Sequence, residues 1–259
     1  MLDSLVCSVD VFDLIKLRKR KDKLVSVTMH GRGTELLPHE NNNAAKAAEA
    51  FVSALGTCGA DITVYKNIPV GAGMGGSSAD AAGVLNGMAR LYGAGSARDL
   101  KALADTLGSD TGYMLSGGFA RLSGRGEKVV NLDISRSLHF LMLIPEGGVS
   151  TPQCYKKYDE KPQCAPVTDG ALKALERGDS AGLGASLGNA LYAPATELNA
   201  GVAKAYKELK AFSPLGVNMT GSGSGVYALF ETPELCDWAR SRYRGKAECF
   251  KLKTVRGVK

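Results

Sequence analysis

Residues 69–80 read Pro69-Val70-Gly71-Ala72-Gly73-Met74-Gly75-Gly76-Ser77-Ser78-Ala79-Asp80. Four of the six residues from Gly71 to Gly76 are glycines, a composition that costs conformational entropy unless the backbone must approach something closely. Ile62 and Val64 alternate with polar neighbours before this loop, and apolar side chains recur at helical spacing after it. The order of strand, glycine loop and helix predicts an anion site, because the first N–H groups of a helix have no partner within it.

The side chains of the loop favour a phosphate as the anion. Ser77 and Ser78 supply hydroxyls for phosphate oxygens or for Mg²⁺, and we interpret Asp80 as a first-turn acid that the helix dipole favours. Gly71-x-Gly73-x-x-Gly76 also matches the dinucleotide fingerprint, but the preceding strand is amphipathic, whereas the first strand of that fold is buried. No Gly-Lys-Ser or Gly-Lys-Thr follows the glycines, which excludes a Walker A loop. A connector that binds nothing is the remaining alternative.

The whole stretch from Pro69 to Ala79 resembles the second motif of the GHMP kinases, the superfamily of galacto-, homoserine, mevalonate and phosphomevalonate kinases. Residues 220–225 resemble the third motif, a glycine loop that supports the active site. Within the superfamily, the likeness is strongest to the kinases that phosphorylate the 2-hydroxyl of 4-diphosphocytidyl-2-C-methyl-D-erythritol. Four further stretches carry it: Lys66-Asn67-Ile68-Pro69, Leu107-Gly108-Ser109-Asp110, Gly124-Arg125-Gly126-Glu127, and Pro145 with Val149-Ser150-Thr151-Pro152.

The resemblance implies a role for each matched residue, with ATP and Mg²⁺ as cofactors. Asp110 falls on the catalytic aspartate, which accepts or orients the substrate hydroxyl as it attacks the γ-phosphorus. The implied nucleotide-binding residues are Asn42, Lys66, Pro69, Gly71, Ala72, Gly73, Met74, Gly75, Gly76, Ser77 and Ser78, and the two serines are also the implied metal ligands. The implied substrate-binding residues are Asp110, Thr151, Tyr155, Gly221, Ser222 and Gly223.

Three of these residues have structural alternatives. Asn42 and Lys66 match positions near the adenine, but Asn42 also suits a helix N-cap and Lys66 an exposed strand lysine. Tyr155 matches the aromatic ring that stacks on the cytosine, and a half-buried core tyrosine is its alternative.

The pattern of elements predicts an α+β chain of two domains, residues 1–136 and 137–259. Alternation in residues 9–17 and 24–28 predicts a β-hairpin, with the basic cluster of residues 16–23 as its solvated turn. From His139 onward, a strand, helices, two strands, a helix and a strand predict a ferredoxin-like layer. The resemblance implies the two-domain GHMP kinase fold, in which the N-terminal domain is like domain 2 of ribosomal protein S5.

Composition narrows the possible partners. The chain has 259 residues, 44% hydrophobic and 22% charged, which is typical of a globular protein. Its net charge is +6, but the basic cluster has no interleaved aromatic residues, so we expect no nucleic-acid partner. No apolar run is long enough for a membrane span, and six cysteines without a CxxC pair favour reduced thiols over a zinc site. We expect a cytoplasmic monomer or homodimer that acts on a small molecule.

Kinases of the resembled family begin with a strand that carries a Pro-Ala-Lys-Ile-Asn-Leu-like motif, followed by a Tyr-His pair, and Met1 aligns just after that pair. The resemblance therefore implies a first strand and a catalytic lysine that this sequence lacks. Three hypotheses account for this: a wrongly chosen start, a homologue that binds nucleotide without transferring phosphate, or replacement of the lysine by a side chain of the basic cluster. A catalytically impaired nucleotide-binding protein and a GHMP kinase for another small alcohol are thus the alternative functions.

Overall fold

The structure is a computed structural model that describes residues 2–31, 33–34, 42–162 and 168–257. The described residues form two compact units: the first draws on Met1–Val70, Gly75–Leu132 and Arg256–Lys259, and the second on Gly71–Met74 and Asp133–Val255. The predicted domain boundary near residue 136 stays a prediction. Within the described ranges, no helix is long and apolar enough to cross a membrane.

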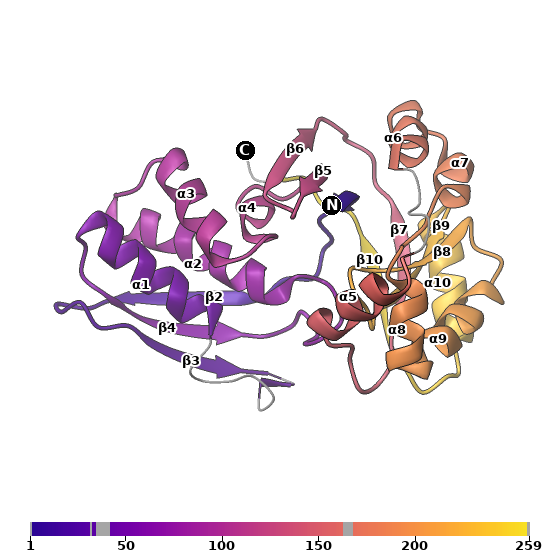
Figure 1. Cartoon of the computed structure of the whole chain (residues 1–259), viewed down its shortest axis with the longest axis horizontal. Coiled ribbons are helices and arrows are strands. Elements are labelled where there is room, and N and C mark those ends of the chain that lie inside the picture. The colour runs from indigo at the N-terminus through magenta and orange to yellow at the C-terminus, as the bar shows by residue number, and fades with distance from the viewer. Residues whose placement is uncertain (1, 32, 35–41, 163–167, 258–259) are drawn as a thin grey trace. The chain divides into compact units, whose positions relative to one another are not determined.

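The first unit places helices on one face of a three-stranded sheet (Figure 1). This sheet has the order β2-β4-β3, and a second sheet has the antiparallel order β1-β5-β6. The strands are β1 (Leu2–Cys7), β2 (Leu14–Lys19), β3 (Ser26–His30), β4 (Ala60–Tyr65), β5 (Phe119–Gly124) and β6 (Lys128–Leu132). The helices are α1 (Asn43–Leu55), α2 (Gly76–Tyr92), α3 (Ala97–Leu107) and α4 (Thr111–Met114). Phe51, Leu85 and Met88 from α1 and α2 pack on Ile62 of β4 to form the core.

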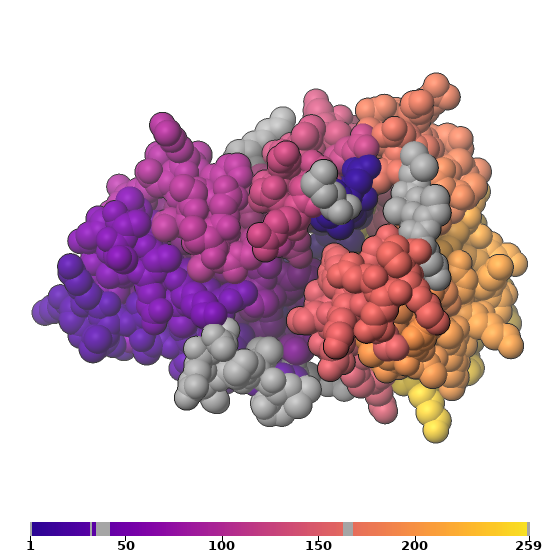
Figure 2. All heavy atoms as spheres, in the orientation of Figure 1, coloured from indigo at the N-terminus to yellow at the C-terminus, as the bar shows by residue number. Residues whose placement is uncertain are grey.

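The second unit contains a four-stranded antiparallel sheet with the order β10-β7-β9-β8. In chain order within the unit this is fourth-first-third-second, which confirms the predicted ferredoxin-like layer. The strands are β7 (His139–Ile144), β8 (Gly216–Met219), β9 (Val226–Phe230) and β10 (Glu248–Lys253). The helices are α5 (Thr151–Glu160), α6 (Thr168–Arg177), α7 (Ser180–Ala185), α8 (Tyr192–Leu198), α9 (Ala200–Lys210) and α10 (Pro233–Arg242). Figure 2 shows α5, in salmon, at the surface of this unit.

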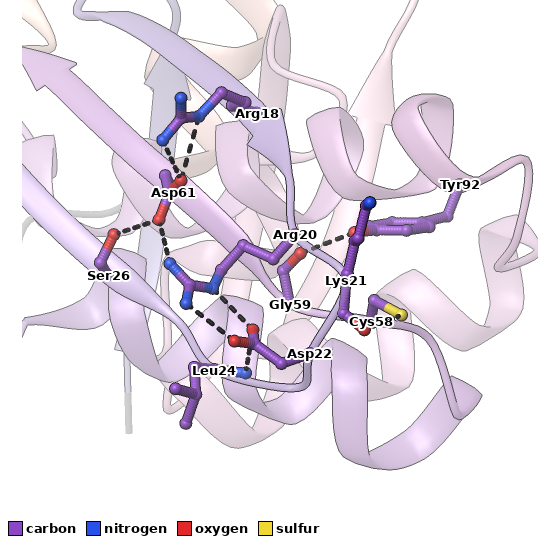
Figure 3. A network of polar contacts seen from close by, with 10 residues as sticks. All are labelled: Arg18, Arg20, Lys21, Asp22, Leu24, Ser26, Cys58, Gly59, Asp61 and Tyr92. Atoms are coloured by element: carbon purple, nitrogen blue, oxygen red, sulfur yellow. Dashed lines mark hydrogen bonds and ion pairs between the residues drawn. The ribbon is translucent and has the colours of Figure 1, made fainter.

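The predicted hairpin of residues 9–28 is wrong, because β4 lies between its two strands. β2 pairs antiparallel with β4, and β3 pairs parallel with it on the other side. Asp61 of β4 joins the three strands: its carboxylate accepts hydrogen bonds from Arg18 at 2.7 Å, Arg20 at 2.6 Å and Ser26 at 2.8 Å (Figure 3). Two of the six basic residues of the cluster, Arg18 and Arg20, therefore form ion pairs with Asp61.

Gly59 explains how the chain crosses from β2 to β3. Its N–H donates to the carbonyl of Asp22 at 2.7 Å, and its carbonyl accepts from the N–H of Arg20 at 3.0 Å. A Cβ atom at this position would lie 1.8 Å from the carbonyl oxygen of Leu24, so only glycine fits beside the crossing segment.

The helices of the first unit largely follow their sequence signals. Asn42 caps α1, Gly93 ends α2 in the left-handed conformation with φ 63°, and Ser96 forms a capping box with Asp99 at the start of α3. The sequence did not predict β1, α5 or α8.

Candidate active site

The N-terminus of α2 offers unpartnered backbone N–H groups. Gly75 is the N-cap with φ 70° and supplies no side-chain cap, and the first helical hydrogen bond runs from the N–H of Ala79 to the carbonyl of Gly75 at 2.9 Å. The N–H groups of residues 76–78 therefore have no partner inside the helix. The side chain of Ser77 is exposed and that of Ser78 is half-buried, and both residues belong to the segment that carries these donors. Such an end of a helix binds phosphate well.

Asp110 lies near Gly75, the N-cap residue of α2. It is the N-cap of α4, it is half-buried, and its Oδ2 atom lies 3.9 Å from the point where a Cβ on Gly75 would stand. Burial raises its pKa. No group in the described part of the chain hydrogen-bonds its carboxylate. A carboxylate in this state is able to accept a proton from a bound hydroxyl.

Two hydroxyls flank the segment that carries Asp110. A Cβ on Gly108 would lie 3.4 Å from Oγ1 of Thr111 and 3.8 Å from Oγ of Ser78, so α2 and α4 converge at Gly108. The Oγ1 atom of Thr111 is buried and has no hydrogen-bond partner. Sequence reasoning missed Thr111, because nothing in its neighbours signals a buried hydroxyl.

Lys66 lies inside a buried ion cluster. Its Nζ donates to Oδ2 of Asp13 and to Oδ2 of Asp80, the latter at 2.7 Å. The three side chains are 3%, 3% and 4% exposed, so the exposed strand lysine is excluded. The interpretation of Asp80 as a first-turn acid is also wrong, because α2 begins at Gly76 and its first turn holds no acid. Sequence reasoning missed Asp13, which lies 53 residues from Lys66 in the chain.

Asn42 acts as the predicted N-cap. Its Oδ1 accepts from the N–H of Ala44 at 2.9 Å, and its Nδ2 contacts the sulfur of Met29 at 2.8 Å. The roles of Asn42 and Lys66 at an adenine stay predictions.

The first half of the glycine loop belongs to the second unit, where it lies on the second glycine loop. The N–H groups of Ser224 and Gly225 donate to the carbonyls of Gly71 at 3.2 Å and Ala72 at 3.1 Å. The hydroxyl of Thr220 donates to the carbonyl of Gly73 at 3.0 Å. A Cβ on Gly73 would lie 2.3 Å from the carbonyl oxygen of Thr220, so the glycine is required for this contact.

Five of the six predicted substrate-binding residues lie in the second unit, and Asp110 lies in the first. The hydroxyls of Thr151 and Ser222 are 2.7 Å apart, which brings the start of α5 to the second glycine loop. The Nδ2 of Asn189 holds the carbonyl of Gly221 at 2.8 Å. Tyr155 is 43% exposed on α5, so it is not a core residue.

The site fits a magnesium ion that is held mainly by phosphates. Among the described residues, no group of three or more His, Cys, Asp or Glu side chains could hold a metal. Mg²⁺ commonly keeps waters and binds through one or two protein ligands together with substrate phosphates. The hydroxyls of Ser77 and Ser78, in the first turn of α2, suit that arrangement.

Comparison with known proteins assigns the family. The model of the GHMP kinases N terminal domain matches residues 42–120, and that of the GHMP kinases C terminal matches residues 171–241. The 4-diphosphocytidyl-2-C-methyl-D-erythritol kinase of Pelotomaculum thermopropionicum is 35% identical over 242 residues, which cover 92% of this chain and 83% of that protein. The chain belongs to the GHMP kinases.

Another relative and two solved structures are also similar to this GHMP kinase. The protein of the same name from Mycolicibacterium smegmatis is 37% identical over 238 residues, which cover 86% of this chain and 71% of that protein. A crystal structure of 4-(cytidine 5'-diphospho)-2C-methyl-D-erythritol kinase matches with a TM-score of 0.75 at 29% identity, covering 96% of this chain and 89% of that one. Homoserine kinase from Cytophaga hutchinsonii shares the fold, with a TM-score of 0.78 at 20% identity, covering 98% and 89%.

Proposed function

We propose that this GHMP kinase transfers the γ-phosphoryl group of ATP to the 2-hydroxyl of 4-diphosphocytidyl-2-C-methyl-D-erythritol, a step of non-mevalonate isoprenoid synthesis. The observation that carries the proposal is Asp110, a half-buried carboxylate with no partner among the described residues, beside the first residues of a phosphate-binding helix. The relatives at 35% and 37% identity support the choice of substrate, because both carry the name of that kinase.

The nucleotide phosphates are bound by the loop and the end of α2. The N–H groups of residues 76–78 donate to phosphate oxygens, and the glycines of residues 71–75 allow the backbone to approach them. The hydroxyls of Ser77 and Ser78 would hold Mg²⁺, which would neutralise charge on the phosphates. Pro69 and Met74 complete the loop around the nucleotide, and Asn42 lies on the side of the adenine.

Asp110 serves as the proton acceptor. Its carboxylate takes the proton of the 2-hydroxyl as the hydroxyl oxygen forms a bond to the γ-phosphorus. The bond between that phosphorus and the β-phosphate oxygen breaks, and ADP leaves with the electron pair. Because phosphoryl transfer depends mainly on positioning and charge stabilisation, a single well-placed carboxylate suffices.

Residues of the second unit bind the cytidine substrate in this proposal. The exposed ring of Tyr155 stacks on the cytosine, and the paired hydroxyls of Thr151 and Ser222 hydrogen-bond the substrate. The backbone of Gly221 and Gly223 allows close approach. We place the enzyme in the cytoplasm as a monomer or homodimer without a nucleic-acid partner.

A substrate panel tests the proposal. ADP release is measured with ATP, Mg²⁺ and, in turn, 4-diphosphocytidyl-2-C-methyl-D-erythritol, mevalonate and homoserine. We expect turnover with the cytidine substrate alone. Turnover with mevalonate or homoserine instead would assign another small alcohol. ADP binding without turnover of any alcohol would favour a nucleotide-binding protein of the same fold.

A further inference from the structure

The buried ammonium of Lys66 joins three segments of the first unit. Asp13 precedes β2, Lys66 follows β4, and Asp80 lies on α2. Oδ1 of Asp13 also accepts the backbone N–H groups of Asn67 at 2.6 Å and Ile68 at 2.8 Å. Asp13 therefore holds both the side chain of Lys66 and the backbone that leads into the glycine loop.

This cluster lies against Gly76, the first residue of α2. A Cβ on Gly76 would stand 3.1 Å from Cγ2 of Ile68 and 3.4 Å from Nζ of Lys66. The N–H of Gly76 is one of the free donors at the end of the helix. A shift of residues 66–68 would therefore displace the N–H groups at the start of α2, which bind the phosphates in the proposed function.

The charges in the cluster do not suit a ligand-binding lysine. Two carboxylates surround one ammonium, and Oδ1 of Asp80 is buried without a hydrogen-bond partner. A buried ion cluster contributes little net stability, whereas removal of one member is costly because it leaves the others uncompensated. Its position beneath the phosphate-binding end of α2 gives it a role in geometry.

We propose that Lys66 is a positioning residue: clamped by Asp13 and Asp80, it holds residues 66–68 and the first turn of α2 so that the N–H groups of residues 76–78 meet the nucleotide phosphates. The side chain of Lys66 itself touches neither the phosphates nor the adenine. This inference rests on the proposed function, since it presumes that ATP binds at α2.

A positioning role and an adenine-contacting role of Lys66 affect the binding of ADP and of adenosine differently. A lysine that positions the phosphate donors affects ligands that carry phosphates and spares adenosine. A lysine that contacts the adenine affects ADP and adenosine by the same factor. The ratio of the two affinities therefore distinguishes the roles, and general loss of stability does not change it.

The test uses Lys66→Met in the full chain, with ADP affinity measured by calorimetry and adenosine affinity by competition with ADP. We expect ADP to bind at least about tenfold more weakly and adenosine to bind within about twofold of the wild type. Equal losses for both ligands would assign an adenine contact, and an unchanged ADP affinity would also overturn the inference. If the wild type bound no ADP, the proposed function would fail before the variant is considered.

Asp13→Asn is the second variant, and it keeps the test available if Lys66→Met, which leaves two carboxylates uncompensated, does not fold. The amide keeps one acceptor oxygen but loses either the ammonium or the two backbone N–H groups as partners. We expect the same loss of ADP affinity with adenosine spared, and wild-type ADP affinity in this variant would refute the clamp. Asp61→Asn is the matched control, since it removes a charge-paired carboxylate from β4 itself and is expected to leave both affinities unchanged (Figure 3).

Discussion

The carboxylate of Asp110 lies 3.9 Å from the point where a Cβ on Gly75 would stand. Gly75 also has φ 70°, a conformation that costs a residue with a side chain about 1–2 kcal/mol. We expect Gly75→Ala to lower kcat/KM at least about tenfold, because the methyl group strains the N-cap of α2 and would stand 2.7 Å from Cε of Met114, in the helix that Asp110 caps.

Gly93→Ala is the control for this substitution. Gly93 caps the other end of α2 with φ 63°, and a Cβ there meets nothing within 4 Å. The control therefore carries the same backbone strain in open space. Equal losses of kcat/KM in the two variants would attribute the effect to helix stability and contradict the role of Gly75 at the site.

Asp80 gives the protein a pH dependence of stability. Burial, followed by the charge of Asp13, raises its pKa, and Lys66 opposes this only in part. A carboxyl whose pKa is higher in the folded state binds more protons there than in the unfolded state. The folded protein therefore loses stability as the pH rises from the ordinary pKa of the carboxyl through the raised pKa. We expect the wild type to lose stability relative to Asp80→Asn between pH 5 and pH 8, as measured by urea unfolding. A stability difference that stays constant over that range would show that the pKa of Asp80 is not raised.

Thr111 carries a hydroxyl that folding desolvates without a partner. Its Oγ1 is buried and makes no hydrogen bond. Because such a group costs about 1–3 kcal/mol, we expect Thr111→Val to raise the free energy of unfolding by about 1 kcal/mol. Thr111→Ser keeps the hydroxyl and loses a methyl, and it should destabilise. A destabilised valine variant would mean that the hydroxyl has a partner in solution.

Asp61 stabilises the β2-β4-β3 sheet. Hydrogen bonds from Ser26, Arg20 and Arg18 lower its pKa (Figure 3). Because the pKa of Asp61 is lower in the folded state, its ionised carboxylate stabilises the fold at pH values above the ordinary pKa. This stabilisation is lost as the pH falls through the lowered pKa. We expect Asp61→Asn to have a lower urea midpoint than the wild type at pH 7, and a smaller deficit at pH 3. A deficit that does not change with pH would assign the effect to packing.

The local elements near the site could be predicted because their signals lie within a few residues. Glycines, serines and a helical apolar pattern specify the loop and α2, and Ser96 with Asp99 specifies the start of α3. Long-range pairing has no such signal. The alternation in β2 and β3 predicts strands but not their partner. β4 lies between them, and its Asp61 binds side chains from both.

The same limit applies to the candidate site. Asp110 was found through its surrounding motif, whereas the clamp on Lys66 depends on Asp13, 53 residues away. A lysine after an alternating strand is typical of an exposed position, and only the fold shows that two carboxylates bury it.

The central claim is that Asp110 accepts the proton of the substrate hydroxyl during transfer from ATP. Phosphorus NMR of the reaction with ATP, Mg²⁺ and 4-diphosphocytidyl-2-C-methyl-D-erythritol tests it most directly, with the wild type beside Asp110→Asn. We predict a new phosphomonoester signal that appears in step with ADP, and a loss of rate of about 10²–10⁴-fold in the variant with ADP affinity retained. ADP without a phosphomonoester, or an undiminished rate in Asp110→Asn, would contradict the account.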